Sequence, residues 1–125
     1  MPLRLSQQEF HKLVEEAMGD LPAAVQHMME NVEVFVEPWP SREQLESTGT
    51  PNRYGLLGLY EGIPLTDRDY YNMVLPDRIS LFHHPLEAVC DSVDELAEEV
   101  RATIIHEIAH HVGWSDEDLE RIEGR

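Results

Sequence analysis

Two histidines and a glutamate near the end of the chain have the spacing of a metal site. His106, Glu107 and His110 form the pattern H-E-x-x-H. On a helix, side chains four positions apart lie on the same face, so His106 and His110 can bind one metal ion together. Glu107 follows the first histidine directly and could take a proton from a water molecule that the metal activates. The pattern therefore indicates a zinc site with Glu107 as its catalytic base.

The residues after His110 extend the pattern to H-E-x-x-H-x-x-G-x-x-D. Gly113 can adopt a positive φ, end the helix and turn the chain sharply. Asp116 then arrives at the spacing at which a third ligand usually follows this motif. A catalytic zinc ion has three protein ligands and one open coordination position. We therefore predict one Zn²⁺ per chain, held by His106, His110 and Asp116.

Alternatives to Asp116 as the third ligand remain open. The residues from Ser115 to Asp118 are also typical of the capped start of a last helix, where Asp116 would only complement the helix dipole. His83 and His84, in or directly after a predicted strand, are alternative third ligands. A further hypothesis is that the histidines are purely structural and bind no metal.

A long amphipathic helix must position these residues. Ser92 can cap its first turn. At about 100° per residue, one apolar stripe faces the sheet. The stripe comprises Val93, Leu96, Ala97, Val100, Ile104 and Ile108. His106 and His110 point away from this stripe, as expected of ligands that face a cleft. His111 falls on it, and we interpret His111 as a packing or hydrogen-bonding residue, not as a ligand.

Shorter elements precede this helix. Ser6 begins a capping-box pattern, and Pro22 suits the first turn of a second helix. The inward residues of the two helices are predicted to be Phe10, Leu13, Val14, Ala17 and Met18, then Val25, Met28 and Met29. Alternating valines at 32–36 and apolar runs at 55–60 and 77–83 predict three strands. A long connection over 61–76 contains Asp67, Asp69, Tyr70 and Tyr71, and connections of this length are often functional.

The composition fits one globular domain over residues 1–125, of class α+β, with a small, about three-stranded sheet packed against helices. Its 25 acidic and 9 basic residues give a net charge of −16. This charge repels phosphate backbones and anionic lipids, so we expect no nucleic-acid or membrane partner, and it favours cations. The single cysteine, Cys90, is expected to be a small core residue. Without an apolar leader or spanning segment, we expect a cytoplasmic protein.

Three stretches of the chain resemble a known family. Residues 55–65, 77–82 and 106–119 are similar to the small bacterial zincin-like metallopeptidase family, which has a minimal zincin fold. The resemblance implies a small sheet packed on helices, with a long zinc-binding helix after an edge strand. In zincins that strand pairs with an extended peptide substrate, and residues 79–83 would be its equivalent here.

Two functions are consistent with this resemblance. The first is a zinc-dependent metallopeptidase that cleaves a peptide or protein substrate, with Glu107 as general base. The second is a non-catalytic module that binds extended peptides and is stabilised by its metal.

Overall fold

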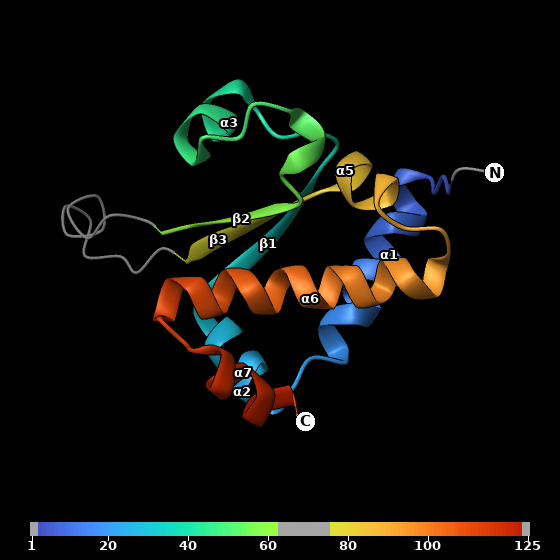
Figure 1. The fold of residues 1–125 in the computed structure, drawn as a ribbon. Coiled ribbons are helices and arrows are strands. Elements are labelled where there is room, and N and C mark those ends of the chain that lie inside the picture. The colour runs from blue at the N-terminus through green and yellow to red at the C-terminus, as the bar shows by residue number, and fades with distance from the viewer. Residues whose placement is uncertain (1–2, 63–75, 124–125) are drawn as a thin grey trace.

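A computed structural model describes residues 3–62 and 76–123 (Figure 1). The predicted connection at 61–76, with its tyrosines and aspartates, lies almost wholly outside this range. At the centre of the fold is a three-stranded sheet with the order β1-β3-β2. Its strands are β1 (Val32–Glu37), β2 (Gly58–Glu61) and β3 (Asp77–Phe82). Strand β3 is parallel to β1 and antiparallel to β2. The α+β class and the small sheet predicted from the sequence are confirmed.

The burial of the strands follows their positions in the sheet. In β1, Glu33 and Phe35 are exposed, whereas the alternating valines are partly buried against the core, as predicted. In β3, the four residues from Ile79 to Phe82 are all buried, as in a strand covered on both faces. The expectation that residues 79–83 form an edge strand is wrong, because β3 is paired on both sides. His83 lies outside the strand and begins α5 (His83–Ala88).

The long helix α6 (Val93–Val112) runs across one face of the sheet (Figure 1). Its N-cap forms as predicted, because the Ser92 hydroxyl accepts a 3.1 Å hydrogen bond from the backbone N–H of Glu95. The buried face contains Leu96, Val100, Thr103, Ile104, Ile105, Ile108 and Ala109. Val93 is the exception to the predicted stripe. It lies in the first turn and is 52% exposed.

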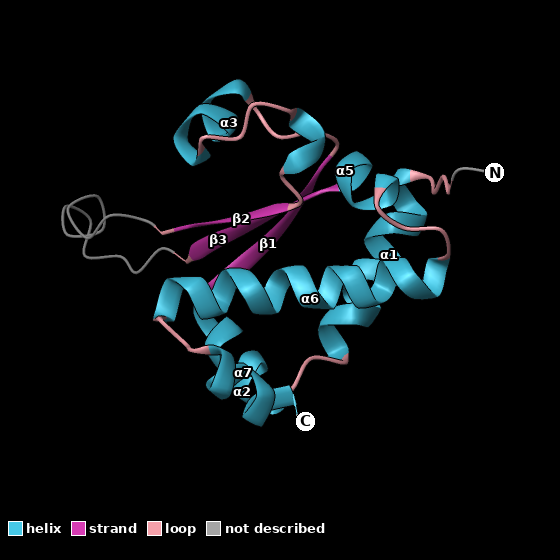
Figure 2. Ribbon diagram, viewed as in Figure 1, coloured by secondary structure: helices cyan, strands magenta, loops and turns pink. Residues whose placement is uncertain are grey.

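The remaining helices surround α6 and the sheet (Figure 2). Helix α1 (Gln7–Gly19) begins with the predicted capping box of Ser6 and packs on α6. After it come α2 (Ala23–Met28), the 3₁₀ turn η1 (Met29–Asn31), α3 (Arg42–Thr48), the 3₁₀ turn η2 (Arg53–Gly55) and, at the end, α7 (Asp116–Glu123). Met28, predicted to point inward, is exposed. Helix α3 lies on the side of the sheet away from α6. Among the described residues, no helix is long and apolar enough to cross a membrane.

Candidate functional site

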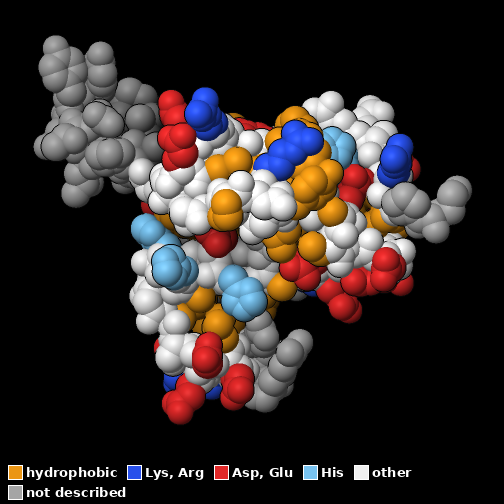
Figure 3. Space-filling view, turned by 45° about the horizontal axis from the view of Figure 1, so that its top comes forward, with side chains coloured by type: hydrophobic (Ala, Val, Ile, Leu, Met, Phe, Trp, Pro, Cys, Tyr) orange, Lys and Arg blue, Asp and Glu red, His pale blue; other side chains and the backbone are white. Residues whose placement is uncertain are grey.

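His106 and His110 lie one turn apart in the C-terminal half of α6, and both side chains are exposed. Within the described part of the chain, neither imidazole has a hydrogen bond or ion pair, so their nitrogen atoms are available to a ligand. Figure 3 shows histidine side chains gathered on the surface between the sheet and the C-terminal helix. The predicted orientation of both histidines, away from the core, is confirmed.

The Glu107 carboxylate is half-buried and contacts strand β2. Its Oε1 accepts a 2.9 Å hydrogen bond from the backbone N–H of Tyr60. Along an antiparallel strand, successive residues direct their backbone N–H and C=O groups alternately toward the partner strand and away from it. The carbonyl of Leu57 accepts a hydrogen bond from the N–H of Phe82, so Leu57 is directed toward β3. Tyr60, three residues further on, therefore directs its N–H away from β3. Glu107 therefore satisfies a backbone donor at the edge of the sheet. This contact fixes the orientation of the carboxylate, and its Oε2 makes no hydrogen bond within the described residues.

Gly113 ends α6 as predicted. Its φ of 76° is in the left-handed region, where a side chain would be strained. The N–H of Trp114 donates a 2.9 Å hydrogen bond to the carbonyl of Ala109 and closes the last turn. The chain therefore leaves the helix directly after His110 and turns toward α7.

Asp116 is the first residue of α7 and is exposed. The preceding residue caps this helix, because the Ser115 hydroxyl accepts a 3.2 Å hydrogen bond from the N–H of Asp118. The Asp118 carboxylate in turn accepts a 2.9 Å hydrogen bond from the N–H of Ser115, which lowers the pKa of Asp118. The capped start of a last helix, the alternative that the sequence left open, is thus present. The Asp116 carboxylate takes no part in this cap, and it makes no hydrogen bond within the described residues.

The candidate ligands do not form a closed group. Among the residues that the structure describes, only His83, His84 and Glu87 bring three possible ligand atoms within 4.8 Å of one another. A tetrahedral zinc site holds its ligand atoms roughly 3.5 Å apart, so His106, His110 and Asp116 must turn toward one another to share an ion. Their donor types, exposure and lack of other partners fit zinc, and the helix places the two imidazoles on one face.

His83 and His84 lie in α5, which follows the C-terminal end of β3. Residues near the end of α6 instead lie beside the start of β3, where Asp77 begins the strand (Figure 1). The length of the central strand thus separates the two groups. The alternative in which His83 or His84 completes the site of His106 and His110 is therefore wrong.

An aromatic cluster next to Glu107 was not anticipated. The rings of His111 and Tyr60 stack with their centroids 4.0 Å apart and their planes at 19°. The Tyr60 hydroxyl donates a 2.6 Å hydrogen bond to the Asp77 carboxylate. The stacking on Tyr60 is a packing contact of His111, but its expected place on the buried stripe of α6 is wrong, because the side chain is exposed and lies against β2. No spacing in the sequence brings these residues together, because each comes from a different element.

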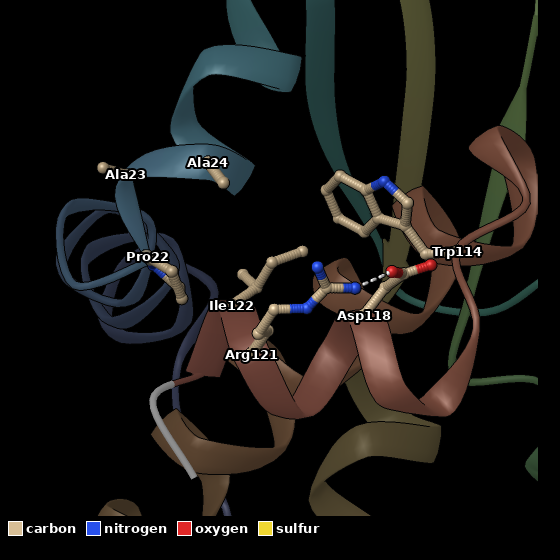
Figure 4. Close-up of a pocket in the computed structure, with 7 residues that line it drawn as sticks. All are labelled: Pro22, Ala23, Ala24, Trp114, Asp118, Arg121 and Ile122. Atoms are coloured by element: carbon tan, nitrogen blue, oxygen red, sulfur yellow. Dashed lines mark hydrogen bonds and ion pairs between the residues drawn. The ribbon is translucent and has the colours of Figure 1, made fainter.

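A pocket of about 550 Å³ lies elsewhere, between α2 and α7 (Figure 4). It is lined by Pro22, Ala23, Ala24, Trp114, Asp118, Arg121 and Ile122. In the close-up, the Arg121 guanidinium points to the Asp118 carboxylate, with which it forms an ion pair. None of the predicted ligands lines this pocket, so it does not contain the candidate metal site.

Comparison with known proteins supports the interpretation of the motif. The sequence model of the zincin-like metallopeptidases matches residues 29–125. The matched region runs from before β1 through α7 and includes His106, Glu107, His110 and Asp116. A search of curated proteins found no match to this chain.

Proposed function

The chain belongs to the zincin-like metallopeptidase family, and on that premise we propose that it is a zinc-dependent peptidase. His106, His110 and Asp116 would hold one Zn²⁺. The observation that carries the proposal is the position of Glu107, whose carboxylate is held by the N–H of Tyr60 on the helix that also carries two exposed imidazoles. Metal-assisted hydrolysis requires a base that activates water next to the metal ligands.

When bound, the zinc ion supplies a Lewis acid that polarises the scissile carbonyl and lowers the pKa of water. The role of Glu107 is to transfer a proton from the water to the leaving amine. One carboxylate oxygen stays on the N–H of Tyr60, and the other takes a proton from the attacking water. The water oxygen bonds to the carbonyl carbon, the C–N bond breaks, and Glu107 passes the proton to the leaving amine. Atoms and charge balance without a further reactant.

We expect the substrate to be a peptide or an unfolded protein segment. Among the described residues β2 lies at the edge of the sheet, and the backbone groups of Gly58 face away from β3. An extended peptide could add to such an edge through main-chain hydrogen bonds. This role replaces the one expected for residues 79–83, and it brings the substrate backbone close to Glu107.

Replacement of the base tests the proposal. We expect Glu107→Gln to lower the rate of peptide hydrolysis by about 100-fold or more, because the amide cannot accept the proton. The zinc content should not change, because Glu107 is not a ligand. Hydrolysis of an unfolded protein by zinc-loaded wild type and variant is the measurement.

Glu98→Gln is the matched control, since Glu98 is an exposed glutamate of the same helix. It removes the same charge and should retain full activity. Equal rates for wild type and Glu107→Gln, at equal zinc content, would contradict the proposed base.

A non-catalytic peptide-binding module is the second candidate. The exposure of His106 and His110 favours it, because the site is open to solvent. In this case zinc-loaded wild type and Glu107→Gln would bind an extended peptide equally well, and neither would cleave it.

A further inference from the structure

A second group of metal-binding side chains lies in α5, at the opposite end of β3 from the zinc motif. His83 and Glu87 are buried, with 5% and 7% of their surface exposed. The side chain of His84 is 44% exposed and completes the group. His83 Nε2 lies 3.0 Å from one Glu87 oxygen, and His84 Nδ1 lies 3.6 Å from the other. All three ligand atoms lie within 4.8 Å of one another.

The buried imidazole lacks a hydrogen-bond partner. His83 Nε2 is close to Glu87, but the alignment does not make a hydrogen bond, and no other described residue supplies one. Most buried polar atoms are paired, so an unpaired one that faces two other ligand atoms indicates a missing partner. An ion pair between His83 and Glu87 alone would leave this nitrogen without a hydrogen bond.

The three side chains are held in place by their neighbours. The His83 ring stacks on Phe10 with the centroids 4.2 Å apart, and on His84 with the centroids 4.7 Å apart. The Glu87 carboxylate accepts a 2.6 Å hydrogen bond from the N–H of Leu5. Such outer contacts fix the orientation of ligands before a metal binds.

We propose that His83, His84 and Glu87 form a second binding site for a divalent transition metal. Two imidazole nitrogens and one carboxylate oxygen suit Zn²⁺ and Co²⁺, and they leave a coordination position for water. Two pockets of about 230 and 420 Å³ reach the group and give an ion access. Because Glu87 also binds the N–H of Leu5, the metal would tie α5 to the start of the chain and stabilise the fold.

Metal binding in a protein without the zinc motif tests this site. In the His106→Ala/His110→Ala background we expect one Zn²⁺ per chain by elemental analysis after dialysis, and a visible absorption band when Co²⁺ alone is added. Zn²⁺ alone should raise the midpoint of thermal unfolding, because the metal binds only the folded protein.

In this background, His84→Ala should weaken Zn²⁺ binding at least tenfold and abolish the Co²⁺ band. Glu87→Gln is the second variant, because its amide oxygen can still accept from Leu5 and preserve the fold. His27→Ala is the control. His27 lies 3.3 Å from Glu30 in an exposed pair without a third ligand, and its loss should change nothing. Absence of metal from the background protein, or binding that survives both His84→Ala and Glu87→Gln, would overturn the proposal.

Discussion

At the residue scale, burial determines the chemistry of Cys90. Its side chain is 5% exposed and belongs to the hydrophobic core, as the sequence predicts. Burial, assisted by the nearby Glu95 and Glu99, raises the pKa of the thiol from 9.0 to about 11. The thiolate is therefore disfavoured in the folded protein at neutral pH, and Cys90 is not suited to be a nucleophile.

This pKa predicts a pH dependence of stability. The folded-state value exceeds the unfolded one, so the contribution is fully present below pH 9 and is lost as the pH rises toward about 11. Over this window the free energy of unfolding of wild type should fall relative to that of Cys90→Ala, by at most about 1.4 kcal/mol per pH unit. Urea denaturation of both proteins from pH 8 upward measures the difference. Parallel profiles would show that Cys90 ionises equally well in the folded chain.

The sequence predicts single residues of the candidate site when their roles depend on local spacing. The helical positions of His106 and His110, the exposure of both and the helix end at Gly113 follow from periodicity and from the conformational freedom of glycine. The contact of Glu107 with Tyr60 joins residues 47 positions apart. Such a contact depends on how the strand lies over the helix, which no local pattern specifies.

At the element scale, the close approach of β2 to α6 depends on Gly58. A Cβ atom at this position would lie 2.7 Å from the Thr103 methyl group and 3.1 Å from the carbonyl oxygen of Ser80. We expect Gly58→Ala to destabilise the protein by about 1–3 kcal/mol, because neither the helix nor the central strand can move freely. Urea denaturation is the measurement.

Gly19→Ala is the matched control for this substitution. No atom lies within 4 Å of a Cβ at Gly19, which ends α1. Its effect should be neutral or slightly stabilising, since alanine favours a helix. Equal losses of stability at both positions would show that the Gly58 contact does not limit packing.

The arrangement of the strands was harder to predict than their existence. The three strands follow from alternation and apolar runs, but the parallel pairing of β1 with β3 and the central position of β3 do not. The expectation from the sequence is an edge strand here, whereas the apolar residues Ile79, Leu81 and Phe82 fit a central one, because strands covered on both faces lack alternation. Ser80, which is buried with them, interrupts this pattern in the sequence.

At the scale of the whole molecule, the two candidate metal groups share a strongly acidic protein. The net charge of −16 attracts cations and repels polyanions. The group in α6 has the family motif, whereas the group in α5 has the buried, unpaired imidazole. From the sequence alone, His83, His84, His106 and His110 were all candidate ligands of one metal site. Their separation by the central strand follows only from the fold.

The zinc content of His84→Ala, compared with that of His84→Ala/His110→Ala, tests the central claim most directly. Both proteins lack His84, so the measurement reports on the site of α6 alone. After equal zinc loading and dialysis, we predict one Zn²⁺ per chain in the first protein and almost none in the second. Equal zinc contents, or no zinc in His84→Ala, would contradict a zinc site built on His106 and His110 and with it the proposed peptidase.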